Sequence, residues 1–86
     1  MPEICRFLGI TIFMYHDDHE PPHFHVRYGG QRAVMEIGSS PVVRGRLSPR
    51  VLGMVVEWSA IHRAELLENW KRARRKEALN RIQPLE

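Results

Sequence analysis

Apolar runs separated by turn residues occupy the first half of the chain. Residues 8–15 (LGITIFMY) combine β-branched and aromatic side chains, so we expect a central strand that is covered on both faces. Two further β-prone runs follow it, and a turn is expected at residues 38–41. Residues 42–47 carry two arginines and are expected to form a weaker strand at an edge. The pattern predicts an antiparallel β-meander of three to four strands in residues 1–47.

The two middle runs, residues 23–28 and 31–37, flank Gly29-Gly30. A glycine pair between β-prone runs is typical of a tight hairpin, and such a turn fixes the register of its strands. Side chains alternate between the two faces of a strand. We therefore expect His23 and His25 to project from one face, with the apolar partners on the other face, towards the core. The expected pairs are Tyr28 with Gln31, Val26 with Ala33, Phe24 with Met35, His25 with Val34 and His23 with Glu36.

Helical patterns fill most of the second half. Ser48 can cap a helix, and Pro49 suits its first position because proline has no N–H to lose. Residues 51–61 are apolar around much of the helix circumference and should lie across the sheet. Residues 62–79 show a narrower apolar stripe, and the pattern leaves open whether this second helix continues the first. The helical part spans residues 48–79, and residues 80–86 form an extended tail. The fold class is α+β, an antiparallel meander of three to four strands packed against one or two C-terminal helices.

Length and composition narrow the class of protein. A chain of 86 residues with 43% hydrophobic residues is expected to form a single domain, residues 1–86, with one modest core. Cys5 is the one cysteine, so no disulfide can form within the chain. The sequence has no apolar run long enough for a bilayer and no signal-peptide pattern at its start. We expect a soluble cytoplasmic protein that does not associate with a membrane.

Charge is distributed unevenly along the chain. Residues 1–43 hold three basic and five acidic side chains, a net charge of −2, whereas residues 44–86 hold ten and five, a net charge of +5. A basic segment in the second helix could contact nucleic-acid phosphates. The alternative is a solvated helix face whose basic end is favoured by the helix dipole. The candidate nucleic-acid-binding residues are Lys71, Arg72, Arg74, Arg75 and Lys76.

The stretch from Tyr15 to Tyr28 (YHDDHEPPHFHVRY) holds four of the five histidines. Histidine is the commonest metal ligand and the side chain that titrates nearest to neutral pH. His23 and His25 are candidates for catalysis or metal binding, with Glu36 as a partner that orients an imidazole. Nitrogen and oxygen ligands without thiolate suit zinc, manganese or iron, so a divalent metal is the one cofactor to consider. The candidate metal ligands are His23, His25, His19 and Asp18.

A structural interpretation of the same stretch is also open. Asp17, Asp18 and His19 would order the loop through hydrogen bonds from side chain to backbone. His23 would pair with Glu36 on a polar face of the sheet.

Several motifs resemble a family of short bacterial proteins known as domain of unknown function four-one-six-zero. They cover nearly the whole chain in order, and DH-x-PPHFH is the most specific of them. The resemblance implies a small α+β domain that forms one half of a two-gene toxin–antitoxin-like module with another small protein, and it implies no catalytic residues. His16 departs from the small polar residue usual before the acidic pair, so it is the least expected of the four histidines to be essential. The motifs are MPEI, RF and GI at the start, then DDHEPPHFHVRYGG, LSPRVLGMVVEW, HRAELLENW and IQPL.

Two hypotheses of function follow. In the first, the protein is a binding module that docks a small protein partner encoded nearby, with nucleic acid or a second copy of the chain as further partners. In the second, it is a metal- or histidine-dependent hydrolase or nuclease that uses the face carrying His23 and His25. The first is favoured because the sequence contains no complete catalytic constellation.

Overall fold

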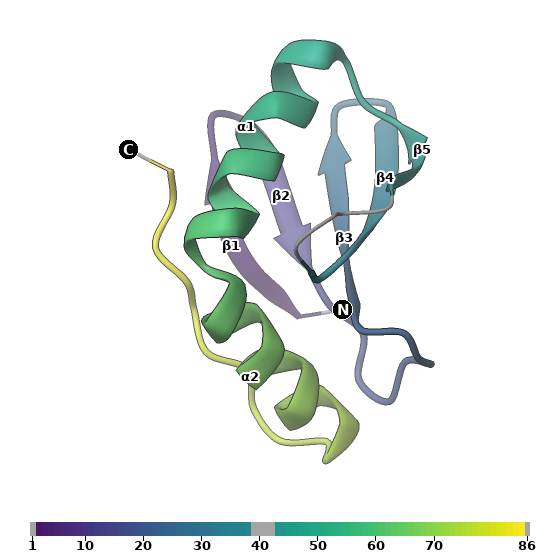
Figure 1. The fold of residues 1–86 in the computed structure, drawn as a ribbon, viewed down its shortest axis with the longest axis vertical. Helices are drawn as coiled ribbons and strands as arrows, with labels where there is room; N and C mark the ends of the chain where they lie inside the picture. Colours follow the sequence, from purple (N-terminus) through teal and green to yellow (C-terminus); the bar gives the residue numbers. More distant parts are fainter. Residues whose placement is uncertain (1, 39–42, 86) are drawn as a thin grey trace.

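A five-stranded antiparallel sheet forms the body of the computed structural model, which describes residues 2–38 and 43–85. Its strands follow one another across the sheet in chain order; α1 lies across one face, and α2 continues beyond the lower end of the sheet (Figure 1). The predicted α+β class is therefore confirmed. The elements are β1 (Glu3–Phe7), β2 (Ile10–Phe13), β3 (His23–Tyr28), β4 (Gln31–Glu36), β5 (Val43–Arg46), α1 (Pro49–Ile61) and α2 (Arg63–Arg74).

The described residues contain one strand more than the sequence pattern predicts. The run at residues 8–15 does not form one long strand, because Leu8 and Gly9 both take positive φ angles and make the turn between β1 and β2. Leu8 is exposed at this turn, although its type suggested a strand. The extra strand, β1, pairs with β2 at one edge of the sheet. Most of the predicted turn at 38–41 lies outside the described residues.

The register of the central hairpin is confirmed at every expected pair. Phe24 lies opposite Met35, and Val26 lies opposite Ala33. These side chains are buried against α1, where Trp58 packs edge-on against Phe24. The sheet therefore has an inner face that α1 covers and an outer face that is turned away from α1 (Figure 1).

The helical part begins as predicted and ends earlier. Ser48 caps α1, since its hydroxyl oxygen accepts a hydrogen bond from the Val51 N–H at 3.5 Å. The helix is interrupted at His62, and α2 ends at Arg74 instead of residue 79. Lys76 has a φ of 59°, and the Glu77 N–H donates to the Arg72 carbonyl at 2.8 Å. This arrangement is a Schellman motif, which stops a helix and turns the chain.

The chain after α2 runs back along the body as an extended tail. Its Ile82 N–H donates to the Ile4 carbonyl at 2.8 Å, and the Gln83 carbonyl accepts a hydrogen bond from Trp58 Nε1 at 2.8 Å. Asn69 fixes the start of the tail, because its side-chain amide exchanges two hydrogen bonds of 2.9 Å with the backbone of Asn80. The tail thereby joins the first strand to the helices.

Candidate functional site

Three candidate residues meet where the loop before β3 returns to the sheet. The Nε2 atoms of His23 and His25 lie 2.8 Å and 3.2 Å from the same oxygen of Asp18, Oδ2. The two imidazoles lie on one side of β3, as predicted from the alternation of strand side chains, with ring centroids 5.2 Å apart. One potential ligand atom from each residue lies within 4.8 Å of the others. The sequence predicted these residues, and the fold brings them into one cluster, here called the Asp–His cluster.

His23 forms the closed side of the Asp–His cluster. Its Nδ1–H donates to the Pro21 carbonyl at 2.7 Å, and the Trp70 ring from α2 lies 5.1 Å away, centroid to centroid. Only 3% of His23 is exposed. The prediction that His23 pairs with Glu36 was wrong in one respect. The two are cross-strand neighbours, but the ring nitrogens of His23 contact Asp18 and Pro21 instead.

His25 forms the open side of the cluster. Its ring stacks on Phe13 at 5.3 Å and meets Tyr15 edge-on at 4.7 Å. About a fifth of its side chain, 19%, is exposed. The ring also lines an open hollow of about 270 Å³ on the outer face of the sheet. The hollow links the cluster to a surface that small or extended ligands can reach. Its other walls include Phe13, Tyr15, Val34, Arg32 and Arg44.

Asp18 carries the negative charge of the cluster. Partial burial opposes that charge and by itself raises the pKa of the carboxyl group. Hydrogen bonds from His25, the His19 backbone N–H and His23 act in the opposite direction, and together they lower the pKa of Asp18 below its ordinary value. Asp18 is therefore a carboxylate at neutral pH.

The other histidines take separate positions. His19 is exposed, and its Nδ1 lies 3.1 Å from the second Asp18 oxygen, at the rim of the cluster. His16 donates from Nε2 to the Glu77 carbonyl at 3.1 Å, and so attaches the loop to the end of α2. His62 lies between the helices, 2.6 Å from Glu65. Of the predicted metal candidates, His19 is therefore peripheral.

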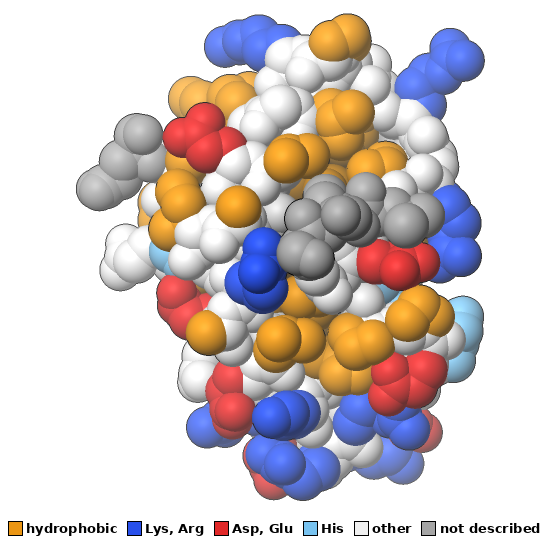
Figure 2. Space-filling view, in the orientation of Figure 1, with side chains coloured by type: hydrophobic (Ala, Val, Ile, Leu, Met, Phe, Trp, Pro, Cys, Tyr) orange, Lys and Arg blue, Asp and Glu red, His pale blue; other side chains and the backbone are white. Residues whose placement is uncertain are grey.

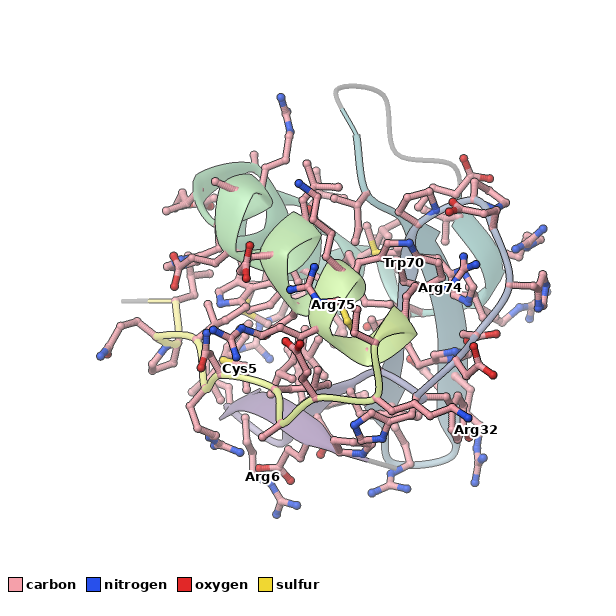
Figure 3. All side chains as sticks on the ribbon, turned by 90° about the horizontal axis from the view of Figure 1, so that it is seen from below. Cys5, Arg6, Arg32, Trp70, Arg74 and Arg75 are labelled. Carbon is pink, nitrogen blue, oxygen red and sulfur yellow. The ribbon has the colours of Figure 1, made fainter. Side chains whose placement is uncertain are left out.

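The outer face of the sheet carries a group of arginines that the sequence interpretation did not recognise as a site. Arg32 lies directly between Arg27 and Arg46 in the register of β3, β4 and β5, and Arg44 projects from the same face opposite Val34. Figure 3 shows Arg32 on the side of the sheet away from the helices. The hairpin register could have revealed this row, because Arg27 and Arg32 are symmetric about Gly29-Gly30. We call Arg27, Arg32, Arg44 and Arg46 the arginine face.

No carboxylate among residues 2–38 and 43–85 forms an ion pair with the arginine face. Arg27 instead lies over the Phe13 ring, 5.9 Å from its centroid. The neighbouring Arg6 differs, since Glu3 holds it at 2.8 Å. The arginine face is therefore a concentration of positive charge that the described part of the fold does not neutralise.

The basic end of α2 is organised differently. Arg72 contacts Glu68 at 3.3 Å, Arg74 contacts Glu20 at 3.1 Å, and Arg75 contacts Glu77 at 3.0 Å. Figure 2 shows basic and acidic side chains interspersed around the lower end of the helix-covered face. Three of the five candidate nucleic-acid-binding residues thus have acidic partners, which reduces the positive potential there. Their role in binding stays a prediction.

Comparison with known proteins identifies the family. The family model described as "Domain of unknown function (DUF4160)" matches residues 9–71, and the chain belongs to this family. No curated protein and no solved structure matches the chain. The match includes the whole Asp–His cluster and the arginine face. Within the described part of the chain, neither helix has the length and apolar character needed to cross a membrane.

Proposed function

We propose that this protein binds single-stranded nucleic acid on the outer face of its sheet. The observation that carries the proposal is the row formed by Arg27, Arg32 and Arg46 on three adjacent strands. Like charges directly opposite each other destabilise a sheet. A ligand with regularly spaced negative charges removes this repulsion when it binds, and a phosphate backbone is such a ligand.

The shape of the face supports a single strand over a duplex. Arg44 and Arg46 are two residues apart on β5, so they repeat by about 6.5 Å along the strand and can follow successive phosphates. Tyr15 stands beside the hollow with 42% of its surface exposed. Aromatic rings next to a basic groove bind unpaired bases by stacking, which a duplex does not permit.

Fluorescence anisotropy with a labelled single-stranded RNA tests the proposal. Each phosphate contact contributes about 0.7 to the slope of log affinity against log salt for a single strand. The double variant Arg32→Gln/Arg44→Gln should therefore lower this slope by about 1.4. The affinity should fall accordingly, while the far-UV circular dichroism spectrum stays that of the wild type.

A matched control variant also removes two positive charges, but from the basic end of α2. Lys71 and Lys76 are exposed, and no carboxylate among the described residues pairs with either of them. Lys71→Gln/Lys76→Gln should bind RNA with nearly wild-type affinity and salt slope. If Lys71→Gln/Lys76→Gln loses as much RNA affinity as Arg32→Gln/Arg44→Gln, or more, the binding site lies on α2 instead. Absence of wild-type binding at low salt would overturn the proposal.

A second candidate function is hydrolysis of a phosphate ester on the same face. One observation favours it, namely that His25 belongs both to the Asp–His cluster and to the wall of the hollow. An imidazole in that position can act as a general base or general acid. RNA cleavage that is lost in His25→Gln, while binding persists, would support an enzyme. Binding without cleavage in the wild type would leave the protein as a binding module.

The small protein partner and the toxin–antitoxin-like pairing remain part of the proposal. They are supported by the resemblance of the sequence motifs, whereas the matching family model describes a domain of unknown function. Co-purification from the native host identifies such a partner. The co-purification is then repeated with Arg32→Gln/Arg44→Gln. Loss of the partner in this variant would show that the partner binds the same arginine face as RNA.

A further inference from the structure

The strongest unassigned feature is the Asp–His cluster, in which three potential ligand atoms converge. Asp18 Oδ2 lies 2.8 Å from His23 Nε2 and 3.2 Å from His25 Nε2. A tetrahedral zinc ion with bonds of about 2.0–2.1 Å places neighbouring ligand atoms about 3.3 Å apart. The spacing around the carboxylate oxygen is therefore close to that of a ligand set, and small rotations of the rings would admit an ion.

The hydrogen bonds of His23 favour a cation at this point. Its Nδ1 faces the Pro21 carbonyl at 2.7 Å, and its Nε2 faces the Asp18 carboxylate. Both oxygens only accept hydrogen bonds. When Nδ1–H donates to Pro21, a neutral ring turns its Nε2 lone pair towards Asp18 Oδ2, so that two acceptor atoms face each other. A cation bound by both atoms satisfies this pair.

The surroundings of His23 match those of metal-bound histidines. Such histidines usually donate their second ring nitrogen to a backbone carbonyl or a carboxylate, which fixes the tautomer and the ring orientation. Pro21 supplies that carbonyl, and the Trp70 ring covers the imidazole. The loop carrying Asp18 is held from α2 by the Asp17 N–H, which donates to the Ala73 carbonyl at 3.0 Å. Two elements distant in sequence thus preform the site.

We propose that Asp18, His23 and His25 bind one divalent transition-metal ion, with zinc as the metal they fit. Two imidazole nitrogens and one carboxylate oxygen, without thiolate, form a ligand set of the kind found in zinc sites that keep an open position. The open position would face the hollow, because His25 lines both. This inference goes beyond nucleic-acid binding and does not rest on it.

Equilibrium dialysis of the full chain against zinc alone, with any affinity tag removed, tests the site. The wild type should take up one zinc ion per chain. Asp18→Asn removes the charged ligand, and His25→Gln removes the partly exposed imidazole with little effect on the core. Each should weaken binding by more than about 100-fold, since loss of an outer-shell partner alone costs about 10- to 100-fold.

A matched histidine variant controls for adventitious binding. His62→Gln makes the same chemical change at the junction of the helices, where His62 pairs with Glu65, and should bind zinc like the wild type. Nuclear magnetic resonance adds a second readout. Zinc should shift the Nε2 resonances of His23 and His25, while His23 Nδ1 stays protonated. Substoichiometric uptake by the wild type at micromolar free zinc, or equal uptake by His25→Gln and His62→Gln, would overturn the proposal.

Discussion

Arg32 on β4 lies directly opposite Arg46 on β5, and no described carboxylate separates or neutralises the two guanidinium groups. On its other side, Arg32 is the cross-strand partner of Arg27. Such an arrangement costs stability in the free protein, because opposite charges at paired positions stabilise a sheet and like charges destabilise it. A protein that accepts this cost at three neighbouring positions has a surface suited to a polyanion.

Charge reversal at Arg46 should raise the stability of the fold and at the same time weaken RNA binding. Arg46→Glu replaces a repulsive cross-strand pair with an attractive one, so the free energy of unfolding should rise by about 0.2–1 kcal/mol. RNA affinity should fall in the same variant. Arg44→Glu is the control, because Arg44 lies opposite Val34 and its reversal relieves no repulsion between paired positions. Urea denaturation and anisotropy measure the two effects, and a destabilised Arg46→Glu that binds RNA normally would contradict this account.

Glycine at position 45 keeps β5 in place. Gly45 has a φ of 96°, and a Cβ atom there would lie 2.5 Å from the Arg32 carbonyl oxygen. Gly45→Ala should therefore destabilise the fold by at least about 1–3 kcal/mol, the usual cost of such a backbone conformation. Gly53→Ala on α1 is the matched control, since its Cβ meets no atom within 4 Å. That change should stabilise the helix by about 0.5–1 kcal/mol. If thermal denaturation finds Gly45→Ala more stable than Gly53→Ala, position 45 does not require glycine.

The first strand is joined to the tail by an ion pair that depends on pH. Hydrogen bonds from Arg81 and then Arg6 lower the pKa of Glu3 below its ordinary value of 4.5. A lowered pKa in the folded state means that Glu3 stabilises the fold above pH 4.5 and loses this effect as pH falls through its folded pKa. The wild type should thus be more stable than Glu3→Gln at neutral pH, and the difference should vanish in acid. High salt should also reduce it, since the pair is at the surface. A difference that persists at low pH would exclude the ion pair as its cause.

Asn69 should be required for docking of the tail. Its side chain is buried, donates to the Asn80 carbonyl and accepts from the Asn80 N–H. Asn69→Asp turns the donor into an acceptor that faces a carbonyl oxygen. The free energy of unfolding should therefore fall by about 1–3 kcal/mol. Asn80→Ala keeps both backbone groups and should leave the free energy of unfolding nearly unchanged. Urea denaturation distinguishes the two, and equal effects would show that the side chain of Asn80, and not its backbone, makes the contact.

The local sequence pattern was sufficient to predict structure where a rule that acts over a few residues fixes the backbone geometry. Gly29-Gly30 and the alternation of strand side chains predicted the hairpin register residue by residue, and with it the common side of His23 and His25. The same pattern failed at Leu8, because Gly9 was interpreted as part of a strand although both residues form a turn. Helix periodicity likewise could not locate the end of α2, which depends on the conformation of Lys76.

The sequence by itself determined the α+β class, the hairpin and the residue types of the candidate site, because periodicity and turn chemistry act over a few residues. Only the tertiary structure decided which groups meet. It brought the Asp18 carboxylate to the two imidazoles in place of Glu36, and it placed Trp70 over His23. It also gave acidic partners to Arg72, Arg74 and Arg75 at the end of α2, whereas no carboxylate of the described residues pairs with the arginine face. Such pairings depend on how the loop and the second helix pack against the end of the sheet, and no local rule of sequence encodes that packing.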